Sequence, residues 1–473
     1  MKVLFLAAES SPLSKVGGLG DVAGELPLAL RRLGLDVCTA VPLHASSDVR
    51  HLTVERTLHL SIPRGDETVG VAVHIARSTD ARYWLVDAEP IRSVPTIYSD
   101  PAQDGDKFTL FCRAVLSACE ALGWIPQILH ANDWHTASAV LWARHLRSAS
   151  REWATVRSVL TIHNLAYMGA GSEGALDAYA VPMPEASDLP TWSQRIPLPL
   201  GLVAADGLTT VSPSYATEIR TPQLGCGLDG VLSARGDRLQ GILNGIDPVV
   251  WDPATDAHLA QPYSAGRRSG RKENKRSLQR ELGLPSRPDV ALLAMVTRMD
   301  FQKGVDLALQ ALPAMLDLPW QFVLLGTGDE TLEAGARALA AAHPERVRVV
   351  QRFDAGLSRR IFAGSDLMLI PSRTEPCGLT QLIALRYGCI PVVRATGGLR
   401  DSITPFAVGS GTGFMFEPAD AAALEHALRQ GLSVFADPGE WSRLQQRAMA
   451  QDFGWDRPAA AYLDFYRRTI SIA

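Results

Sequence analysis

The chain has 473 residues, enough for two or three domains of ordinary size. With 47% hydrophobic and 20% charged residues it is globular, which excludes wholesale disorder. Its 46 basic and 50 acidic residues give a net charge of −4, so nucleic acid is not expected as a partner. Six cysteines, none in a C-x-x-C pair, exclude a disulfide scaffold and indicate a reducing, cytoplasmic compartment.

The first ten residues, MKVLFLAAES, could be a signal peptide or a buried strand. Their apolar core ends after about six residues, shorter than the roughly 7–15 of a signal sequence. We therefore expect a strand over Lys2–Ala8. No run approaches the ~20 apolar residues of a membrane span, so no membrane contact is expected.

Strands and helices then alternate in two blocks. In the first block we expect helices near 21–33, 106–122 and 136–146, and strands at 36–41, 127–132, 157–164 and 207–212. Residues 52–89 contain strand-like runs without helices between them, which predicts an antiparallel excursion. The second block has expected strands at 289–298, 321–326, 347–351, 366–370 and 390–395, with helices at 304–316, 329–343, 379–388, 420–435, 438–451 and 457–470.

Two such blocks predict an α/β fold with two doubly wound, Rossmann-like domains facing across a cleft. The expected boundaries are 1–247, a polar linker at 248–288, a second domain at 289–455, and a helix at 456–473 that packs back on the first domain. The basic residues between Arg267 and Arg276 are predicted to form a solvated face of the linker.

A glycine-rich loop follows the first strand. Lys15, Gly17, Gly18 and Gly20 stand just before a helix, where free backbone N–H groups and a lysine favour an anion. A plain turn is the alternative. The spacing from Gly18 also matches a dinucleotide fingerprint, but the second strand ends without the acidic residue that binds a ribose. A dinucleotide-dependent oxidoreductase therefore stays as an alternative from another class.

Two neighbouring loops of the first block carry polar side chains at strand ends. Asp133 follows one strand and His163 follows the next, where ligands of open α/β sheets bind. Asp133 could instead cap a helix, and His163 could be a structural histidine.

The second block has two comparable loops. Arg298 and Lys303 follow its first strand and could neutralise a diphosphate, although two solvated charges are the alternative. Glu375 precedes a predicted helix start at Cys377, Gly378, Leu379 and Thr380, whose N–H groups would face a phosphate.

Asp104 and Asp106 match the D-x-D spacing of metal-dependent sugar transferases. Because they directly precede a predicted helix, we expect a helix cap and no metal or other cofactor. The sequence contains no H-E-x-x-H, G-x-S-x-G or P-loop motif, which argues against a zincin, a serine hydrolase and a P-loop enzyme.

Taken together, these motifs resemble the bacterial glycogen synthase and starch synthase family, which are retaining, ADP-glucose-dependent glucosyltransferases of the GT-B architecture. The resemblance spans nearly the whole chain, in order. The segments that carry it are KVGGLGDV (15–22), DWHTA (133–137), HNLAY (163–167), VSPSYATEI (211–219), GILNGID (241–247), KENKRSLQ (272–279), TRMDFQKG (297–304), PSRTEPCGLTQ (371–381), RATGGLRDSI (394–403) and DFGW (452–455).

The resemblance implies that the first domain is the acceptor side and the second the nucleotide-sugar side, and that the partners are ADP-glucose and an α-1,4-glucan. It also implies catalytic roles at Glu375, Arg298, Lys303, His163 and Asp133. Implied donor-binding positions are Lys15, Gly17, Gly18, Phe353, Cys377, Gly378, Leu379 and Thr380.

The chain departs from the family pattern at several positions, and Met168 stands where the family's HNLAYQG has a glutamine. Trp192 and Pro199 stand where the family has an asparagine and a lysine, and Phe353 replaces a tyrosine. The alternatives within the class are a GT-B enzyme with another nucleotide sugar or acceptor, and a catalytically weak glucan-binding relative.

Overall fold

The computed structural model describes residues 1–471, which form two compact units. The first unit is Met1–Asn244 together with the C-terminal segment from Trp455, and the second is Gly245–Gly454. The segment expected to be a linker is folded into the second unit. Its Tyr263 hydroxyl donates to the carbonyl of Tyr387 at 2.8 Å, and its helix α9 (Gly270–Glu281) packs on α12 (Ala355–Gly364).

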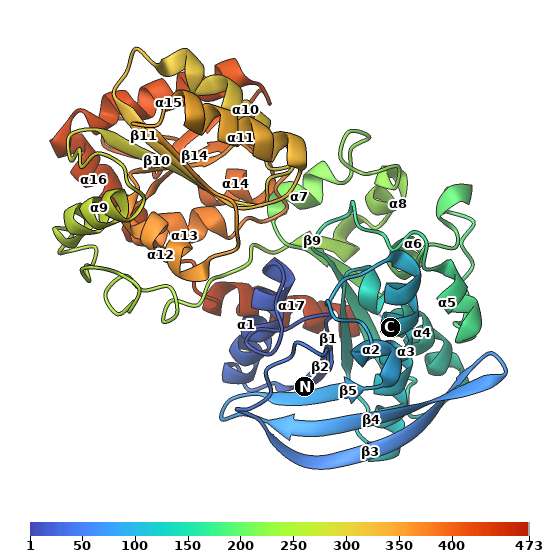
Figure 1. Ribbon diagram of the computed structural model, residues 1–473. Helices are drawn as coiled ribbons and strands as arrows, with labels where there is room; N and C mark the ends of the chain where they lie inside the picture. Colours follow the sequence, from blue (N-terminus) through green and yellow to red (C-terminus); the bar gives the residue numbers. More distant parts are fainter. Residues whose placement is uncertain (472–473) are drawn as a thin grey trace. The chain divides into compact units, whose positions relative to one another are not determined.

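A nine-stranded sheet, in the order β3-β4-β5-β2-β1-β6-β7-β8-β9, forms the centre of the first unit (Figure 1). Its strands are β1 (Lys2–Leu6), β2 (Asp36–Pro42), β3 (Thr53–Arg64), β4 (Glu67–Arg77), β5 (Arg82–Asp87), β6 (Ile128–Asn132), β7 (Arg157–Ile162), β8 (Gly207–Thr210) and β9 (Leu239–Gly241). Pairing is antiparallel for β3–β4 and β4–β5 and parallel elsewhere. The expected antiparallel excursion is present, and the first ten residues do contribute a strand, β1, which is buried from Val3 to Leu6.

Helices cover both faces of this sheet. They are α1 (Gly18–Arg32), α2 (Glu89–Arg92), α3 (Pro101–Leu122), α4 (Ala137–Ala149), α5 (Glu173–Ala178), α6 (Pro197–Ala204), α7 (Pro213–Glu218), α8 (Asp229–Ala234) and α17 (Asp456–Ser471), with short 3₁₀ turns at Trp134–Thr136, Thr191–Ser193 and Gly236–Arg238. Helix α17 lies beside α1 (Figure 1) and buries Tyr462, Phe465 and Tyr466 in the same core as β1. The Tyr466 hydroxyl is 2.6 Å from Nδ1 of His130 on β6.

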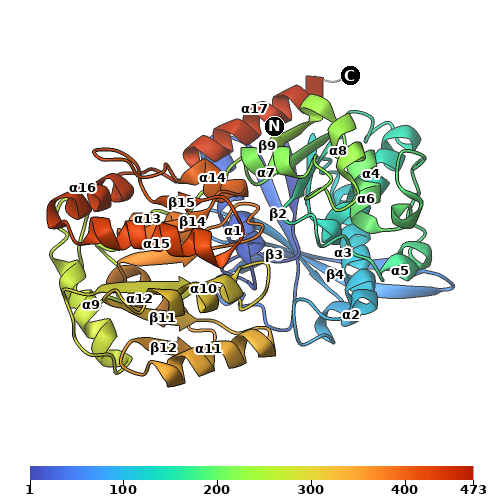
Figure 2. The same cartoon turned by 90° about the horizontal axis from the view of Figure 1, so that it is seen from above.

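The second unit has a six-stranded sheet, all parallel, in the order β12-β11-β10-β13-β14-β15. Its strands are β10 (Ala291–Val296), β11 (Trp320–Leu325), β12 (Val347–Val350), β13 (Leu367–Ile370), β14 (Ile390–Arg394) and β15 (Phe414–Phe416), and Figure 2 shows β12 and β15 at its opposite edges. The other helices are α10 (Val305–Ala311), α11 (Glu330–Ala342), α13 (Thr380–Tyr387), α14 (Gly397–Ser402), α15 (Ala421–Phe435) and α16 (Pro438–Met449), with a 3₁₀ turn at Pro313–Met315. Helices α10, α11 and α15 cover one face, and α9, α12 and α13 the other (Figure 1). No helix among residues 1–471 is long and apolar enough to cross a membrane.

The basic run between Arg267 and Arg276 is only partly the solvated face that we expected, because Arg267, Lys272 and Arg276 are exposed but two of its cations are buried. Arg271 and Lys275 are 7% and 5% exposed, because the folded segment covers them. The Lys275 ammonium donates to Asp366 Oδ2 and to the carbonyl of Val290, both at 2.7 Å, and the Arg271 guanidinium donates to the carbonyls of Tyr387 and Ser365. These cations therefore hold α9 to the sheet.

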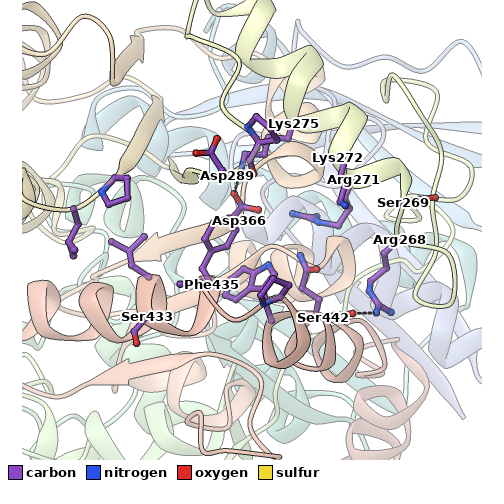
Figure 3. A pocket seen from close by; sticks show the side chains of 18 of the residues that line it. Arg268, Ser269, Arg271, Lys272, Lys275, Asp289, Asp366, Ser433, Phe435 and Ser442 are labelled. Carbon is purple, nitrogen blue, oxygen red and sulfur yellow. Dashed lines mark hydrogen bonds and ion pairs between the residues drawn. The ribbon is translucent and has the colours of Figure 1, made fainter.

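The same residues line a cavity of about 1040 Å³ between α9, α15 and α16 (Figure 3). Arg268 also lines it and donates to the Ser442 hydroxyl at 2.7 Å. No residue that we singled out as a candidate site lines this cavity. We interpret its charges as structural ion pairs.

The D-x-D pair does not form the cap that we expected. Helix α3 begins at Pro101, and its cap is Asp100, which accepts from the N–H groups of Ala102 and Gln103. Asp104 is buried inside the helix and pairs with Lys107 at 2.8 Å, whereas Asp106 pairs with Arg64 at 2.9 Å. Both carboxylates neutralise cations, and within residues 1–471 no three His, Cys, Asp or Glu side chains gather as a metal site.

The Lys275→Met variant tests the structural role of the basic run. It leaves the Asp366 carboxylate buried without its cation, so we expect the free energy of unfolding to fall by about 3–5 kcal/mol in chemical denaturation. Lys272→Met, at an exposed position on the same helix, is the matched control and should change it by less than about 0.5 kcal/mol. Equal effects would contradict the assignment.

Candidate functional site

In the second unit, the loops after β10 and β13 place a lysine on a carboxylate. The Lys303 ammonium is 2.8 Å from both Oε1 and Oε2 of Glu375, and the Ser372 hydroxyl donates to Oε2 at 2.8 Å. The Glu375 side chain is 9% exposed and that of Lys303 is 20% exposed. The sequence predicted Lys303 and Glu375 as site residues, and the fold brings them into direct contact. Ser372 was not singled out, because its role depends on the turn between it and Glu375.

The loop after β14 packs against the backbone of this carboxylate. Gly398 N–H donates to the carbonyl of Glu375 at 3.1 Å. A Cβ at Gly397, where φ is +44°, would lie 2.1 Å from that same carbonyl oxygen, so no larger residue fits without movement. These contacts fix Glu375 from its main-chain side.

Arg298 is tied to the same loop more loosely. Its guanidinium lies 3.5 Å from Asp300 Oδ2 and its side chain is 62% exposed, while Asp300 Oδ1 accepts from Lys303 N–H at 2.8 Å. Asp300 thus connects the two cations that the sequence predicted. Both stand at the carboxyl edge of a parallel sheet, where they are able to bind an anion.

Helix α13 starts beside Glu375, as expected. Gly378 has φ +74°, and the Gln381 amide donates to the carbonyls of Cys377 and Gly378 at 2.9 and 2.8 Å. A Cβ at Gly378 would lie 2.3 Å from Gln381 Oε1. This geometry turns the chain into α13, whose first N–H groups have no partner within the helix. The segment from Gly378 to Thr380 thus offers donors to a negative group.

Phe353 follows β12 and is 91% exposed, free to stack on a planar ring.

The turn after β11 was missed by the sequence analysis. A Cβ at Gly326 would lie 1.8 Å from the carbonyl oxygen of Thr297, and one at Gly328 would lie 2.2 Å from that of Met299. Two glycines around Thr327 directly after a buried strand were the available signal for this close approach.

In the first unit, the glycine-rich loop already contains an internal anion. The Glu9 carboxylate, 1% exposed, accepts from Val16 N–H and from Gly17 N–H, the latter at 3.2 Å. The Lys15 ammonium is paired with Asp21 Oδ1 at 2.7 Å. The expected free N–H group of Gly17 is therefore occupied. An acidic residue between the buried strand and the glycines was the signal that could have revealed it.

Burial shapes the protonation of both carboxyls of this loop. Desolvation raises the pKa of Glu9, although the N–H groups of Val16 and Gly17 oppose the shift. Desolvation also raises the pKa of Asp21, against the opposing charge of Lys15. A ligand would therefore compete with Glu9 for the N–H of Gly17 and with Asp21 for the Lys15 ammonium. Gly18 is the first residue of α1.

Asp133 and His163 are brought together at the ends of β6 and β7. Asp133 Oδ1 accepts from the backbone N–H of His163 at 2.7 Å, and His163 Nε2 lies 2.9 Å from Asn132 Oδ1. Asp133 has φ 56° and ψ −172°, a conformation that is nearly restricted to glycine and costs about 1–3 kcal/mol. Its side chain caps no helix.

Burial also sets the charge of these two groups. It raises the pKa of Asp133 to about 7, although backbone N–H groups of His163 and Asn164 oppose the shift, and it lowers the pKa of His163 to about 3. His163 is therefore a neutral hydrogen-bonding group near pH 7. A strained, buried carboxyl beside a neutral imidazole is suited to bind hydroxyl groups of a ligand.

Comparison with known proteins supports this interpretation. Residues 2–234 match the family model of the starch synthase catalytic domain, and residues 276–443 match that of glycosyl transferases group 1. A glycogen synthase of Anaeromyxobacter dehalogenans strain 2CP-1 is 43% identical over 99% of both chains. The chain belongs to the glycogen synthase family. Another member, from Geobacillus stearothermophilus, is 39% identical over 99% of this chain and 98% of its own.

Solved structures of similar proteins have the same fold. The catalytic domain of starch synthase IV from Arabidopsis thaliana, bound to ADP and acarbose, has a TM-score of 0.90 and 32% identity over 99% of both chains. A sucrose-phosphate synthase from Thermosynechococcus elongatus has a TM-score of 0.62 at 18% identity, which is a likeness of fold. The chain thus has the α/β, GT-B-type fold of two Rossmann-like units that its sequence predicted.

The Asp133→Asn variant tests the buried carboxyl by its pH dependence. Between about pH 4 and about pH 7 the folded wild type keeps a proton that the unfolded chain has lost, so its free energy of unfolding falls as pH rises through this window. The asparagine has no such titration. We expect the variant to gain stability relative to the wild type across the window in denaturant unfolding. A difference that does not change with pH would contradict the raised pKa.

Proposed function

We propose that this protein transfers glucose from ADP-glucose to the non-reducing end of an α-1,4-glucan, with retention at the anomeric carbon. The observation that carries the proposal is the Lys303–Glu375 pair at the start of α13, with Arg298 on the same edge of the sheet. Support comes from full-length relatives that are glycogen synthases and from a related structure that was solved with ADP and acarbose.

In the second unit, the donor's diphosphate would bind Arg298, Lys303 and the backbone from Cys377 to Thr380. These two cations would stabilise the charge that develops on a leaving diphosphate, and a helix N-terminus adds to this stabilisation. The exposed ring of Phe353 would stack on the base, without the hydroxyl of the family's tyrosine. Metal is not needed in this scheme, because the cations take its place.

Glu375 would contact the glucose that is transferred. Lys303 and Ser372 hold its carboxylate in one position, so its oxygens face a sugar with a fixed geometry. No side chain attacks the sugar in our scheme. The acceptor hydroxyl would give its proton to the departing diphosphate on the same face of the ring, which retains the configuration.

In the first unit, Asp133 and His163 would accept and donate hydrogen bonds to glucose hydroxyls near the anomeric carbon. The neutral imidazole donates its Nε2–H to Asn132 Oδ1, which leaves Nδ1 as an acceptor for a glucose hydroxyl. Lys15, Gly17 and Gly18 would contact the donor. Because Glu9 occupies Gly17 N–H, Lys15 and the start of α1 would provide most of that contact. A cytoplasmic location fits the six free cysteines, five of them buried.

The two cations differ in what their removal should do. Arg298→Ala and Lys303→Ala should each lower turnover on the order of 10²-fold or more, as for the loss of a group that stabilises the transition state. Arg298 is largely exposed, so its variant should keep the melting temperature of the wild type. Lys303→Ala leaves Glu375 buried with Ser372 as its partner, and should melt several degrees lower. Turnover at the wild-type level in both variants would overturn the assignment.

Radiolabelled ADP-glucose and UDP-glucose, each incubated with glycogen, test the reaction itself. We expect label in glycogen from ADP-glucose, and undiminished incorporation in excess chelator. No incorporation from either donor would overturn the proposal, as would a reduction or oxidation of nicotinamide followed by absorbance. Preference for UDP-glucose would keep the reaction class and change the donor.

A further inference from the structure

The first unit, which is the acceptor side of the proposed reaction, exposes two aromatic side chains that lie outside the candidate site. Trp192 and Tyr167 are 53% and 51% exposed, which is unusual for rings of this size because burial of an aromatic side chain is favourable. Single exposed apolar residues are common and need no explanation. The exposure of Trp192 and Tyr167 does need an explanation, because both residues lie on adjoining loops at the ligand-binding edge of the first sheet.

The topology fixes that placement. Tyr167 follows β7, and its own N–H donates to the carbonyl of Asn164 in the turn at the strand's end. Trp192 precedes α6, which runs back to the start of β8, so the turn at 191–193 lies at the same carboxyl edge. The N–H of Leu198 donates to the carbonyl of Met168 at 3.1 Å and connects the two loops.

Hydrogen bonds hold the turn around Trp192. Ser193 is completely buried, and both its N–H and its hydroxyl donate to the carbonyl of Pro190 at 2.9 Å. Gln194 adds a hydrogen bond from its amide to the carbonyl of Leu189 at 3.1 Å. With the next residue anchored in this way, the chain has little freedom to withdraw Trp192 from solvent.

One side of the indole rests on a glycine. A Cβ at Gly227, where φ is +78°, would lie 3.2 Å from Cζ2 of Trp192. Gly227 stands just before α8, which Figure 1 shows in the same region of the first unit as α6. The absence of a side chain lets the ring lie against the backbone while its other surface stays open. The indole Nε1 makes no hydrogen bond to another residue of the described chain, so it remains available as a donor.

We propose that Trp192 is an acceptor-binding platform on which a glucose unit of the α-glucan stacks, with Tyr167 as a second contact on the neighbouring loop. A pyranose presents C–H groups on its faces and hydroxyls at its rim. A flat apolar ring with a polar N–H at its edge is complementary to both. A protein or membrane partner would need a wider continuous apolar surface, and polar Gln194 and the Arg195–Asp177 ion pair stand next to Trp192 instead.

The family that the sequence resembles has an asparagine at position 192 and a lysine at position 199, where this chain has Trp192 and Pro199. Pro199 is buried in the first turns of α6, so a lysine there would have to bring its charge out of an apolar helix. This inference rests on the proposed function, because it names the glucan as the ligand.

The test compares Trp192→Ala, Trp192→Phe and Tyr167→Ala with the wild type. Glycogen affinity is measured by migration in native gels that contain glycogen and by calorimetric titration of maltoheptaose, neither of which needs turnover. For Trp192→Ala we expect about tenfold weaker binding and a raised KM for glycogen, with ADP-glucose affinity within about twofold of wild type. Trp192→Phe should retain most of the affinity, and Tyr167→Ala should lose about two- to fivefold.

Leu33→Ala is the matched control. Leu33 is 43% exposed in the same unit, but it follows the end of α1 and precedes β2, at the amino edge of the sheet. Its variant should bind glycogen as the wild type does. Unchanged glycogen affinity in Trp192→Ala, or an equal loss of ADP-glucose affinity, would overturn the platform. If the wild type transfers glucose while Trp192→Ala binds glycogen normally, the proposed function stands and this inference falls. A wild type that neither binds glycogen nor transfers glucose would remove both.

Discussion

Parallel strands need long crossover connections, and this constraint organises both units. Each crossover leaves its strand at the carboxyl end, so loops far apart in sequence arrive at one edge of the sheet. In the second unit this brings Lys303, from the loop after β10, onto Glu375, from the loop after β13. In the first unit it brings Asp133 and His163 together from adjacent strands. The order of the strands thus brings the candidate site residues close together, whatever contacts their side chains make.

Buried carboxylates then fix these loops in detail. Glu9 accepts from two N–H groups of the glycine-rich loop, Asp133 accepts from the backbone of the next strand's loop, and Glu375 is held by Lys303 and Ser372. Burying such groups is unfavourable unless each has partners. Asp133 in addition occupies a strained backbone conformation. Strained or buried polar residues of this kind cluster at sites of binding or catalysis. In both units a buried carboxyl group with fixed partners lies at the carboxyl edge of the sheet.

The lysines to which we assign a role in donor binding form ion pairs with carboxylates within the protein. Lys303 is neutralised by Glu375, and Lys15 by Asp21. A diphosphate that binds to such cations meets side chains that are held in place, which lowers the cost of reorganisation when negative charge develops. The buried cations of α9, in contrast, have a structural role. Lys275 has its donors directed to Asp366 and to main-chain carbonyls, and it stabilises the second unit.

The sequence by itself determined the two alternating blocks, the antiparallel excursion, and the identity of Lys303, Glu375, Asp133 and His163 as strand-end residues, because apolar periodicity and loop position are local properties. Tertiary structure decided which groups are paired. It buried Arg271 and Lys275, placed Glu9 in the glycine-rich loop, and moved the cap of α3 to Asp100. Partners such as Asp366 and Lys275 are far apart along the chain. Burial, and with it the pKa and charge of each group, depends on that long-range packing and has no local signature.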